Sequence, residues 1–199
     1  DYDNKYNLVR SRDTCYVTSL LFPDCITYAK PYSQGAVKLA ITGNSLMGIT
    51  NVIDSLSVVK QFVFDEKIIT METLVNALKA DWVGFEDLRL LIQKKGKFFG
   101  NDDETSNYVA RLFTEAVYDI LKDKRSIWGY KLRVGNLQGY NPHHEWFGKL
   151  VKATPDGRKS GEMLKFGLGQ SDGYDRNGLN ALLNSVAKCD PHGIITSGS

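Results

Sequence analysis

The chain has 199 residues, of which 42% are hydrophobic and 11% aromatic, so it can bury a core as one globular domain. The chain has 25 lysine and arginine residues and 23 aspartate and glutamate residues, which gives a net charge of +2. This balance does not indicate a basic surface for nucleic acid or an anionic membrane. Without a membrane-length apolar run or a targeting pattern, we expect a cytoplasmic protein that binds a small molecule or another protein.

The first half of the chain combines short apolar runs with helical patterns. The runs YVTSLLF (16–22) and AVKLAIT (36–42) predict strands, and apolar residues at three- and four-residue steps predict a helix over 46–64. The apolar face of that helix contains Leu46, Ile49, Val52, Ile53, Leu56, Val59 and Val63. A second helix is expected over 71–80, with Thr70 as its N-cap.

The second half continues this alternation. Helices are expected over 85–96, where Gly96 ends the pattern, over 98–123 and over 178–190. The helix within 98–123 has Asp102, Asp103 and Glu104 at its positive end. Strands are expected over 130–137 and 163–169, and another begins at 195. This pattern predicts an α/β fold whose strands line an interior covered by helices.

The two ends suggest a piece of a longer chain. The sequence starts at Asp1 without an initiator methionine and stops in ITSGS (195–199), directly after the start of a strand. We therefore expect an internal segment of a larger protein, with strand edges and apolar helix faces exposed in isolation and, as a result, poor solubility or self-association.

The three cysteines give no sign of a disulfide framework or a reactive thiol. Cys15, Cys25 and Cys189 are an odd number at spacings that match neither a zinc knuckle nor a CxxC motif. None has a histidine or acidic partner beside it that indicates activation. We expect them to be reduced and to pack as small apolar side chains.

Three other features could form a nucleotide site, a metal site or a buried ionic contact. The segment FGLGQSDG (166–173) is rich in glycine, but its spacing fits neither a P-loop nor a dinucleotide fingerprint, so an ordinary turn is preferred to nucleotide binding. His143, His144 and Glu145 lack a third metal ligand at matching spacing, and we expect no metal. Asp54 lies among core positions, so we expect an ion pair or a cap on a neighbouring element.

Two motifs near the C-terminus carry a resemblance to a known family. TPDGRKSGE (154–162) and GYDRNGLNALLNSVAKCD (173–190) resemble segments of the glycyl radical enzymes of the pyruvate formate-lyase superfamily. The blocks 19–26, 48–78 and 98–103 are similar to family segments in the same order. The resemblance implies that the chain is part of the second half-barrel of the ten-stranded glycyl radical enzyme barrel, with parallel strands covered by helices.

The resemblance also implies which parts are outside this chain. The family stores a radical on a backbone glycine and passes it to a cysteine, which takes a hydrogen atom from the substrate. No cysteine here has the family's Cys-x-Glu pattern, and in LRVGNL (132–137) Asn136 stands where the radical glycine would be. The segment 1–199 is thus expected to lack the reactive-cysteine loop and the glycyl radical loop, to contain no catalytic residue and to be inactive alone.

The same resemblance assigns roles around the two motifs. We expect Asp156 and Arg158 to pin the TPDGR turn through hydrogen bonds and ionic contacts, and Gly157 and Gly161 to allow tight bends. The turn that contains Gly173, Asp175 and Gly178 is expected to open toward the substrate cavity, with Asn177 capping the last helix. Tyr174 is the candidate substrate-binding residue; the alternative is a tyrosine packed between helices.

The function implied is that of an anaerobic glycyl radical lyase. GLNA (178–181), in place of the G-P-T-A of dehydratases, favours the arylacetate decarboxylase branch. The alternatives are a diol or polyol dehydratase and a non-catalytic scaffold that binds a partner. The segment is expected to bind no cofactor itself. The complete enzyme is expected to carry a glycyl radical installed by a radical S-adenosylmethionine activating enzyme and to form a homodimer, in which the remainder of the barrel completes the pocket for a small-molecule substrate.

Overall fold

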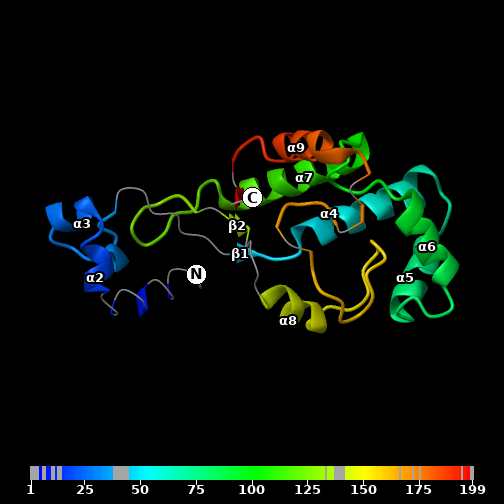
Figure 1. The fold of residues 1–199 in the computed structure, drawn as a ribbon, viewed down its shortest axis with the longest axis horizontal. Coiled ribbons are helices and arrows are strands. Elements are labelled where there is room, and N and C mark those ends of the chain that lie inside the picture. The colour runs from blue at the N-terminus through cyan, green and yellow to red at the C-terminus, as the bar shows by residue number, and fades with distance from the viewer. Residues whose placement is uncertain are drawn as a thin grey trace.

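The computed structural model describes residues 5, 8–9, 12, 15–37, 45–132, 134–136, 142–165, 167–171, 173–174, 176–193 and 195–197. Figure 1 shows a body of packed helices with a small sheet at one end, and a short helical region near the N-terminus at some distance beyond that end. The elements in chain order are α2 (Tyr16–Ser19), α3 (Pro23–Thr27), η1 (Tyr32–Gln34), β1 (Ser45–Leu46), α4 (Ile49–Val58), η2 (Val59–Asp65), α5 (Met71–Lys79), α6 (Glu86–Lys95), α7 (Glu104–Leu121), β2 (Val134–Asn136), α8 (His143–Leu150), α9 (Gly178–Cys189) and β3 (Ile195–Ser197).

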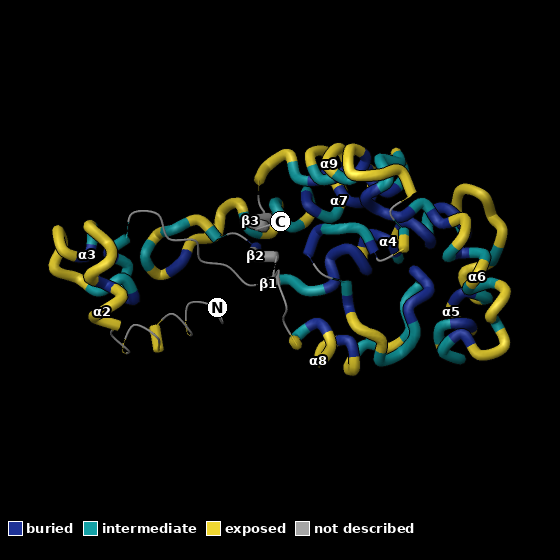
Figure 2. Tube along the Cα trace, in the orientation of Figure 1, coloured by how far each residue is buried: buried dark blue, intermediate teal, exposed yellow. Residues whose placement is uncertain are grey.

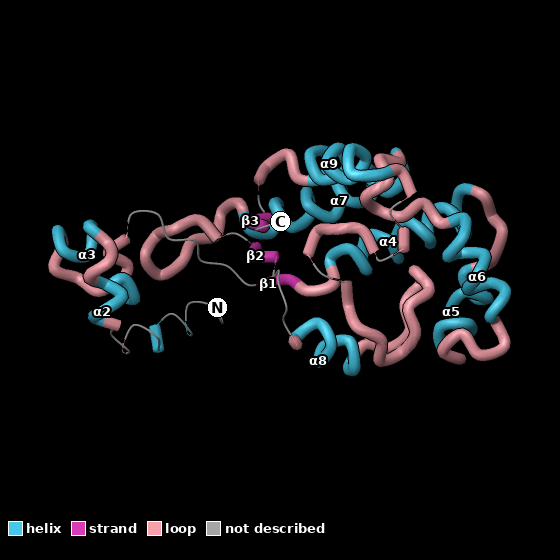
Figure 3. The backbone as a smooth tube through the Cα atoms, viewed as in Figure 1, coloured by secondary structure: helices cyan, strands magenta, loops and turns pink. Residues whose placement is uncertain are grey.

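The three described strands form one parallel sheet in the order β1-β2-β3 (Figure 3). Ser45 pairs with Gly135, and Val134 pairs with Ile195. Parallel pairing of strands far apart in sequence, with helices between them, agrees with the α/β prediction. The sheet does not close into a barrel within the described residues.

Two of the expected strands are wrong. Residues 16–19 of the first form the helix α2, and the described residues of 163–169 form neither a helix nor a strand. Such short apolar runs have no periodicity that separates a strand from one turn of helix. Residues 38–42 of the expected strand 36–42 lie outside the described residues.

The expected helix over 46–64 is divided into three parts. Leu46 belongs to β1, and α4 begins only at Ile49 because Gly48 adopts a left-handed conformation with φ of +73°. Beyond Val58 the backbone is wound as the π-helix η2. The apolar period therefore predicted a helix but not its whole buried face, because Val52 and Leu56 are exposed whereas Thr50, Asn51 and Asp54 are buried. It also missed the boundaries and the change of winding.

The other helices follow their predicted signals. The Thr70 hydroxyl accepts a hydrogen bond of 3.1 Å from the Thr73 N–H at the start of α5, and Asp103 accepts one of 2.8 Å from the Thr105 N–H at the start of α7. Gly96 ends α6 as expected. None of the helices within the described part of the chain combines the length and the hydrophobicity that crossing a bilayer requires.

The core consists of two clusters that α4 and η2 connect (Figure 2). One cluster contains Ile49, Ile53, Phe99, Val109, Ala110, Leu168 and Cys189 and lies between α4, α7 and α9. The other contains Val58, Phe62, Leu74, Ala77, Trp82, Ile92 and Phe98 and includes α5 and α6. Burying these side chains holds the loops that carry both sequence motifs against the helices.

Candidate functional site

The TPDGR turn is closed by its own polar groups. Asp156 is 5% exposed, and its Oδ1 accepts hydrogen bonds from the Thr154 hydroxyl at 2.5 Å and from the Arg158 N–H at 3.4 Å. The Thr154 N–H donates to the Arg158 carbonyl at 3.0 Å. Gly157 and Gly161 have φ of +89° and +79°, a region that favours glycine.

Arg158 holds the backbone on both sides of the turn. Its guanidinium donates hydrogen bonds to the carbonyl oxygens of Glu162 at 2.6 Å, Val151 at 3.0 Å and Lys152 at 2.5 Å. Burial lowers the pKa of Arg158, but an arginine stays charged at any physiological pH. Arg158 thus contacts the backbone on both sides of the turn through charge-assisted bonds to carbonyl groups.

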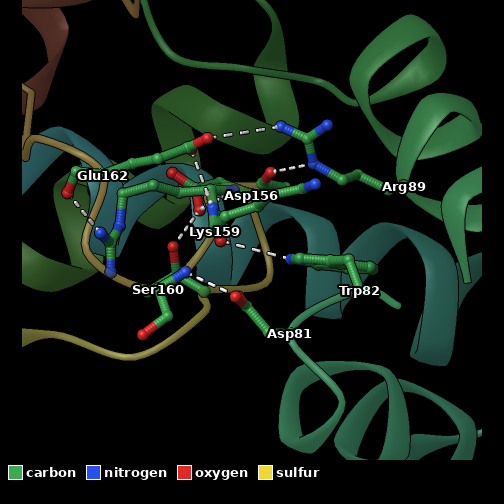
Figure 4. Close-up of polar contacts among 10 residues, drawn as sticks. Asp81, Trp82, Arg89, Asp156, Lys159, Ser160 and Glu162 are labelled. Carbon is green, nitrogen blue, oxygen red and sulfur yellow. Dashed lines mark hydrogen bonds and ion pairs between the residues drawn. The ribbon is translucent and has the colours of Figure 1, made fainter.

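Three side chains from the α5–α6 region hold the turn from outside, as Figure 4 shows. Asp81 accepts a hydrogen bond of 2.7 Å from the Ser160 N–H. The Trp82 indole donates to the Arg158 carbonyl at 3.3 Å, and the Arg89 guanidinium donates to the Gly157 carbonyl at 2.6 Å. No local sequence pattern could predict these contacts, because each joins residues at least 68 positions apart.

Helix α4 holds the turn from the opposite side. The Asn51 side chain donates a hydrogen bond of 2.7 Å to Asp156. Asp54, for which an ion pair or a cap was expected, accepts hydrogen bonds from the Phe99 N–H at 2.8 Å and from the Ser171 hydroxyl at 2.9 Å. Among the described residues its partners are thus hydrogen-bond donors, and the loop at Phe99 is the element that it caps.

Tyr174 lies at the edge of the second core cluster. Its ring centroid is 4.3 Å from that of Phe98, and its carbonyl oxygen accepts a hydrogen bond of 2.8 Å from the Asn101 side chain. The residue is half-buried, and burial raises the pKa of its hydroxyl group. One side of the Tyr174 ring is therefore packed against Phe98.

The turn around Tyr174 is held by Arg176, which the sequence analysis did not single out. Its guanidinium donates to the carbonyl oxygens of Gln93 at 2.5 Å and Lys94 at 2.8 Å, at the C-terminal end of α6. The same group lies 5.7 Å from the centre of the Tyr174 ring. A cation at this end of a helix is favourable, and its position over the ring adds a cation–π contact.

The start of α9 differs from the expectation. Asn177 is at the N-cap position, but its side chain donates to the Asn101 carbonyl at 2.8 Å and does not cap the helix. The Asn177 side chain is used for this contact with the Asn101 carbonyl and is therefore not directed at the start of the helix. Gly173 and Gly178 bound the turn, and Asp175, the remaining residue assigned to it, lies outside the described residues.

The three cysteines differ in their burial. The Cys189 thiol is buried and donates a hydrogen bond of 3.2 Å to the Val186 carbonyl, and burial raises its pKa to about 11. Cys25 is also buried, and Cys15 is exposed. Gly135 pairs within the central strand β2. No cluster of histidine, cysteine or acidic side chains in the described ranges could hold a metal ion.

Comparison with known proteins identifies the family. Residues 8–141 match the family model described as pyruvate formate lyase-like. The chain belongs to this family. The match confirms the resemblance to glycyl radical enzymes that the TPDGR and GYDRNG motifs indicated.

Two curated relatives show how much of such a protein the chain represents. It is 30% identical over 184 residues to trans-4-hydroxy-L-proline dehydratase of Clostridioides difficile, which covers 92% of this chain and 23% of the relative. It is 36% identical over 141 residues to isethionate sulfite-lyase of Bilophila wadsworthia, covering 70% of this chain and 16% of the relative. The chain thus spans less than a quarter of the relatives that it matches.

The fold agrees with a solved member of the family. The crystal structure of hydroxyproline dehydratase from Clostridioides difficile with substrate bound has a TM-score of 0.82 and 30% sequence identity, covering 92% of this chain and 23% of that chain. The described residues are therefore part of the glycyl radical enzyme fold. The match to the 4-hydroxyphenylacetate decarboxylase glycyl radical subunit of the same organism is weaker, at 24% identity over 205 residues.

Proposed function

We propose that this chain is a wall segment of a glycyl radical lyase that eliminates a leaving group from a small polar substrate. The observation that carries the proposal is the similarity to hydroxyproline dehydratase, which extends over 92% of the chain in both sequence and structure. Other relatives that match at 30% identity or more are named as a sulfopropanediol dehydratase and sulfite-lyases. These names share an elimination reaction, so the proposal favours a dehydratase-type lyase.

Decarboxylation of an arylacetate is the second candidate. It is supported by the GLNA segment (178–181), by a tyrosine at position 174 that would suit an aromatic pocket and by the 24% match to the decarboxylase subunit. The dehydratase-type relatives match at higher identity, so elimination takes precedence. A non-catalytic scaffold is the third candidate. Turnover of a substrate by the complete protein would distinguish a lyase from a scaffold.

The contribution of this chain to catalysis is positioning. A glycyl radical, where the complete protein carries one, supplies the abstraction of a hydrogen atom through a cysteine outside this segment. Asp156 and Arg158 fix the TPDGR turn, and Arg176 fixes the turn of Tyr174 against α6. In the complete protein, the rest of the barrel would supply the remaining pocket. An activating enzyme would install the radical, and a second copy of the protein would form a homodimer.

The exposed apolar side chains of α8 and α9 support the idea that this is one part of a larger barrel. Leu150 is 78% exposed and Leu179 is 68% exposed. Groups of large exposed apolar side chains on a protein surface commonly mark a contact with another part of the protein or with a partner. The remainder of the barrel would cover these faces.

The reaction class is tested with the complete protein, prepared without oxygen and activated by a radical S-adenosylmethionine enzyme. The panel contains trans-4-hydroxy-L-proline, glycerol, isethionate and 4-hydroxyphenylacetate. Elimination of water or sulfite supports the proposal. Release of carbon dioxide from 4-hydroxyphenylacetate alone replaces it with the decarboxylase, and no turnover by a protein that carries the radical contradicts both.

The substrate role of Tyr174 is tested in the same protein. Replacing Tyr174 by phenylalanine removes only the hydroxyl group, whereas replacement by alanine also removes the contact with Phe98. A residue that contacts the substrate through its hydroxyl group loses turnover in both variants. Unchanged turnover in Tyr174→Phe and Tyr174→Ala would restrict Tyr174 to packing.

A further inference from the structure

One face of α4 is polar although it is buried in the protein. Thr50 and Asp54 are 0% exposed and Asn51 is 4% exposed. Burying polar groups costs free energy unless each finds a hydrogen-bond partner. The side chains of these three residues all find partners outside α4, so this face makes tertiary contacts that apolar residues could not make.

Most of these partners lie in one stretch of chain, the glycine-rich segment formed by residues 165 and 167–171. The Thr50 hydroxyl donates to the Gly169 carbonyl at 2.9 Å and approaches the Gly167 carbonyl at 3.3 Å. The side-chain amide oxygen of Asn51 accepts a hydrogen bond of 2.8 Å from the Lys165 N–H. Together with the Ser171 bond to Asp54, these contacts hold the segment from its beginning to its end.

Apart from Leu168, which packs in the first core cluster, this segment has little else to define its path. Its described residues form neither a helix nor a strand, and two of them are glycines that have no side chain to pack. Fixing such a backbone costs roughly 1–2 kcal/mol per residue in conformational entropy. The bonds from α4 therefore have to offset much of the cost of ordering this segment.

Asp54 also joins the segment to the loop that holds Tyr174. Its second oxygen accepts from the Phe99 N–H, and the neighbouring Phe98 contacts the Tyr174 ring. Asn101, in the same loop, donates to the Tyr174 carbonyl. Tyr174 follows Ser171 by three residues in the chain. The Asp54 carboxyl group therefore connects the segment before Tyr174, through Ser171, to the loop that packs on Tyr174, through Phe99.

The charge of Asp54 changes near neutral pH. Burial is the main cause that raises the pKa of Asp54 to about 7, and the charge of Asp156 acts in the same direction. The Phe99 and Ser171 hydrogen bonds and the charge of Lys165 oppose the increase. Above that pH the carboxylate is charged in a buried site, which is unfavourable. Opening of the segment would let water solvate the charge.

We propose that Thr50, Asn51 and Asp54 are positioning residues, which fix the path of the glycine-rich segment and thereby the place of the turn that carries Tyr174. This inference rests on the proposed function, because the position of that turn matters to catalysis only if the turn borders the substrate. The order of the segment itself can be measured without any activity.

The first test is amide hydrogen exchange in the complete protein, corrected for the intrinsic effect of pH. Thr50→Val keeps the shape of the side chain but loses the bonds to the segment, and protection at residues 167–171 should fall at least fivefold at every pH. In the wild type, protection of this segment should fall as the pH rises from 5.5 to 8, and in Asp54→Asn this fall should be absent. Asp65→Asn, which changes an exposed carboxylate on η2, is the control and should behave as the wild type.

The second test separates positioning from simple stability. With the substrate found in the panel, Asp54→Asn should remove a step near pH 7 from the pH profile of kcat/KM, and Thr50→Val should raise KM at least threefold while the radical content is unchanged. Equal protection in Thr50→Val and wild type, or a fall with pH that persists in Asp54→Asn, overturns the inference. Changed protection with an unchanged KM and pH profile also overturns it, whereas absence of turnover in the wild type counts against the proposed function.

Discussion

Gly148 of α8 lies directly against the backbone of Glu162, so close that a Cβ atom on Gly148 would overlap the Glu162 carbonyl oxygen. Next to this contact, the Leu164 N–H donates a hydrogen bond of 3.1 Å to the His144 carbonyl. The Glu162 backbone cannot move aside as the end of a flexible side chain does, so α8 can pack against the end of the TPDGR motif only with glycine at this position.

Replacing Gly148 by alanine should therefore destabilise the protein even though alanine favours helices. Pushing α8 away from its contact is a case of overpacking, which costs roughly 1–3 kcal/mol. The free energy of unfolding by urea measures this loss. Lys149→Ala, which removes only the exposed ion pair with Glu145, should cost roughly 0–1 kcal/mol. Equal stability of Gly148→Ala and wild type would contradict the close packing.

Arg158 and Arg125 form a matched pair for a second prediction. Both donate to backbone carbonyl oxygens, but Arg158 is buried and Arg125 is exposed. A lysine keeps the charge but cannot reach three carbonyl groups in the geometry of a guanidinium. Arg158→Lys should lower the free energy of unfolding by roughly 2 kcal/mol, and Arg125→Lys should change it by less than about 0.5 kcal/mol. Similar effects of the two changes would show that the bonds of Arg158 do not hold the turn.

The stability of the protein should depend on the charge of Asp54. The pKa of Asp54 rises from 3.8 in the unfolded chain to about 7 on folding, so the folded state binds more protons between these values. The stability from this group is thus fully present below about pH 4 and is lost as the pH rises through 7. Urea unfolding of the wild type should give a lower free energy at pH 8 than at pH 5.5, by a few kcal/mol.

Asp54→Asn removes the titrating group, so the difference between pH 5.5 and pH 8 should be smaller in this variant. Asp119→Asn is the control, because Asp119 is an exposed carboxylate that pairs with Lys122. It should retain the pH dependence of the wild type. The assignment of the titration to Asp54 fails if Asp54→Asn and Asp119→Asn lose equal stability between the two pH values.

The cysteines should differ in reactivity. Burial and a pKa of about 11 leave Cys189 almost entirely protonated at pH 8, with roughly one thiolate per thousand molecules. Iodoacetamide labelling of the folded protein, followed by peptide mass spectrometry, should modify Cys15 well before Cys189. After denaturation the two should react at similar rates. Rapid labelling of Cys189 in the folded state would contradict its inert, structural environment.

The sequence predicts the long helices well because their apolar period is local. Thr70 and Asp103 mark helix starts through bonds to residues two or three positions away, and the structure confirms both. The run at 16–22 has no such period and was wrongly expected to be a strand. Leu46 was placed in a helix because the apolar pattern continues past Gly48, where the backbone turns.

The site could be located from the sequence but not assembled from it. The TPDGR and GYDRNG motifs indicated the family and the turns around Asp156 and Tyr174. The partners of Asp54 lie 45 and 117 positions away in the sequence, so no local pattern could show that this residue joins two loops. Arg176 was missed because its acceptors are backbone carbonyl groups on α6, which any residue type presents.

The most direct test of the central claim is electron paramagnetic resonance of the complete protein after anaerobic incubation with a radical S-adenosylmethionine activating enzyme. If the chain is part of a glycyl radical lyase, the complete protein should give a carbon-centred glycyl radical signal that oxygen quenches. It should also form an elimination product from one substrate of the panel. A complete, folded protein that gives no radical signal with an activating enzyme competent on a control lyase would contradict the proposed function and leave the scaffold interpretation.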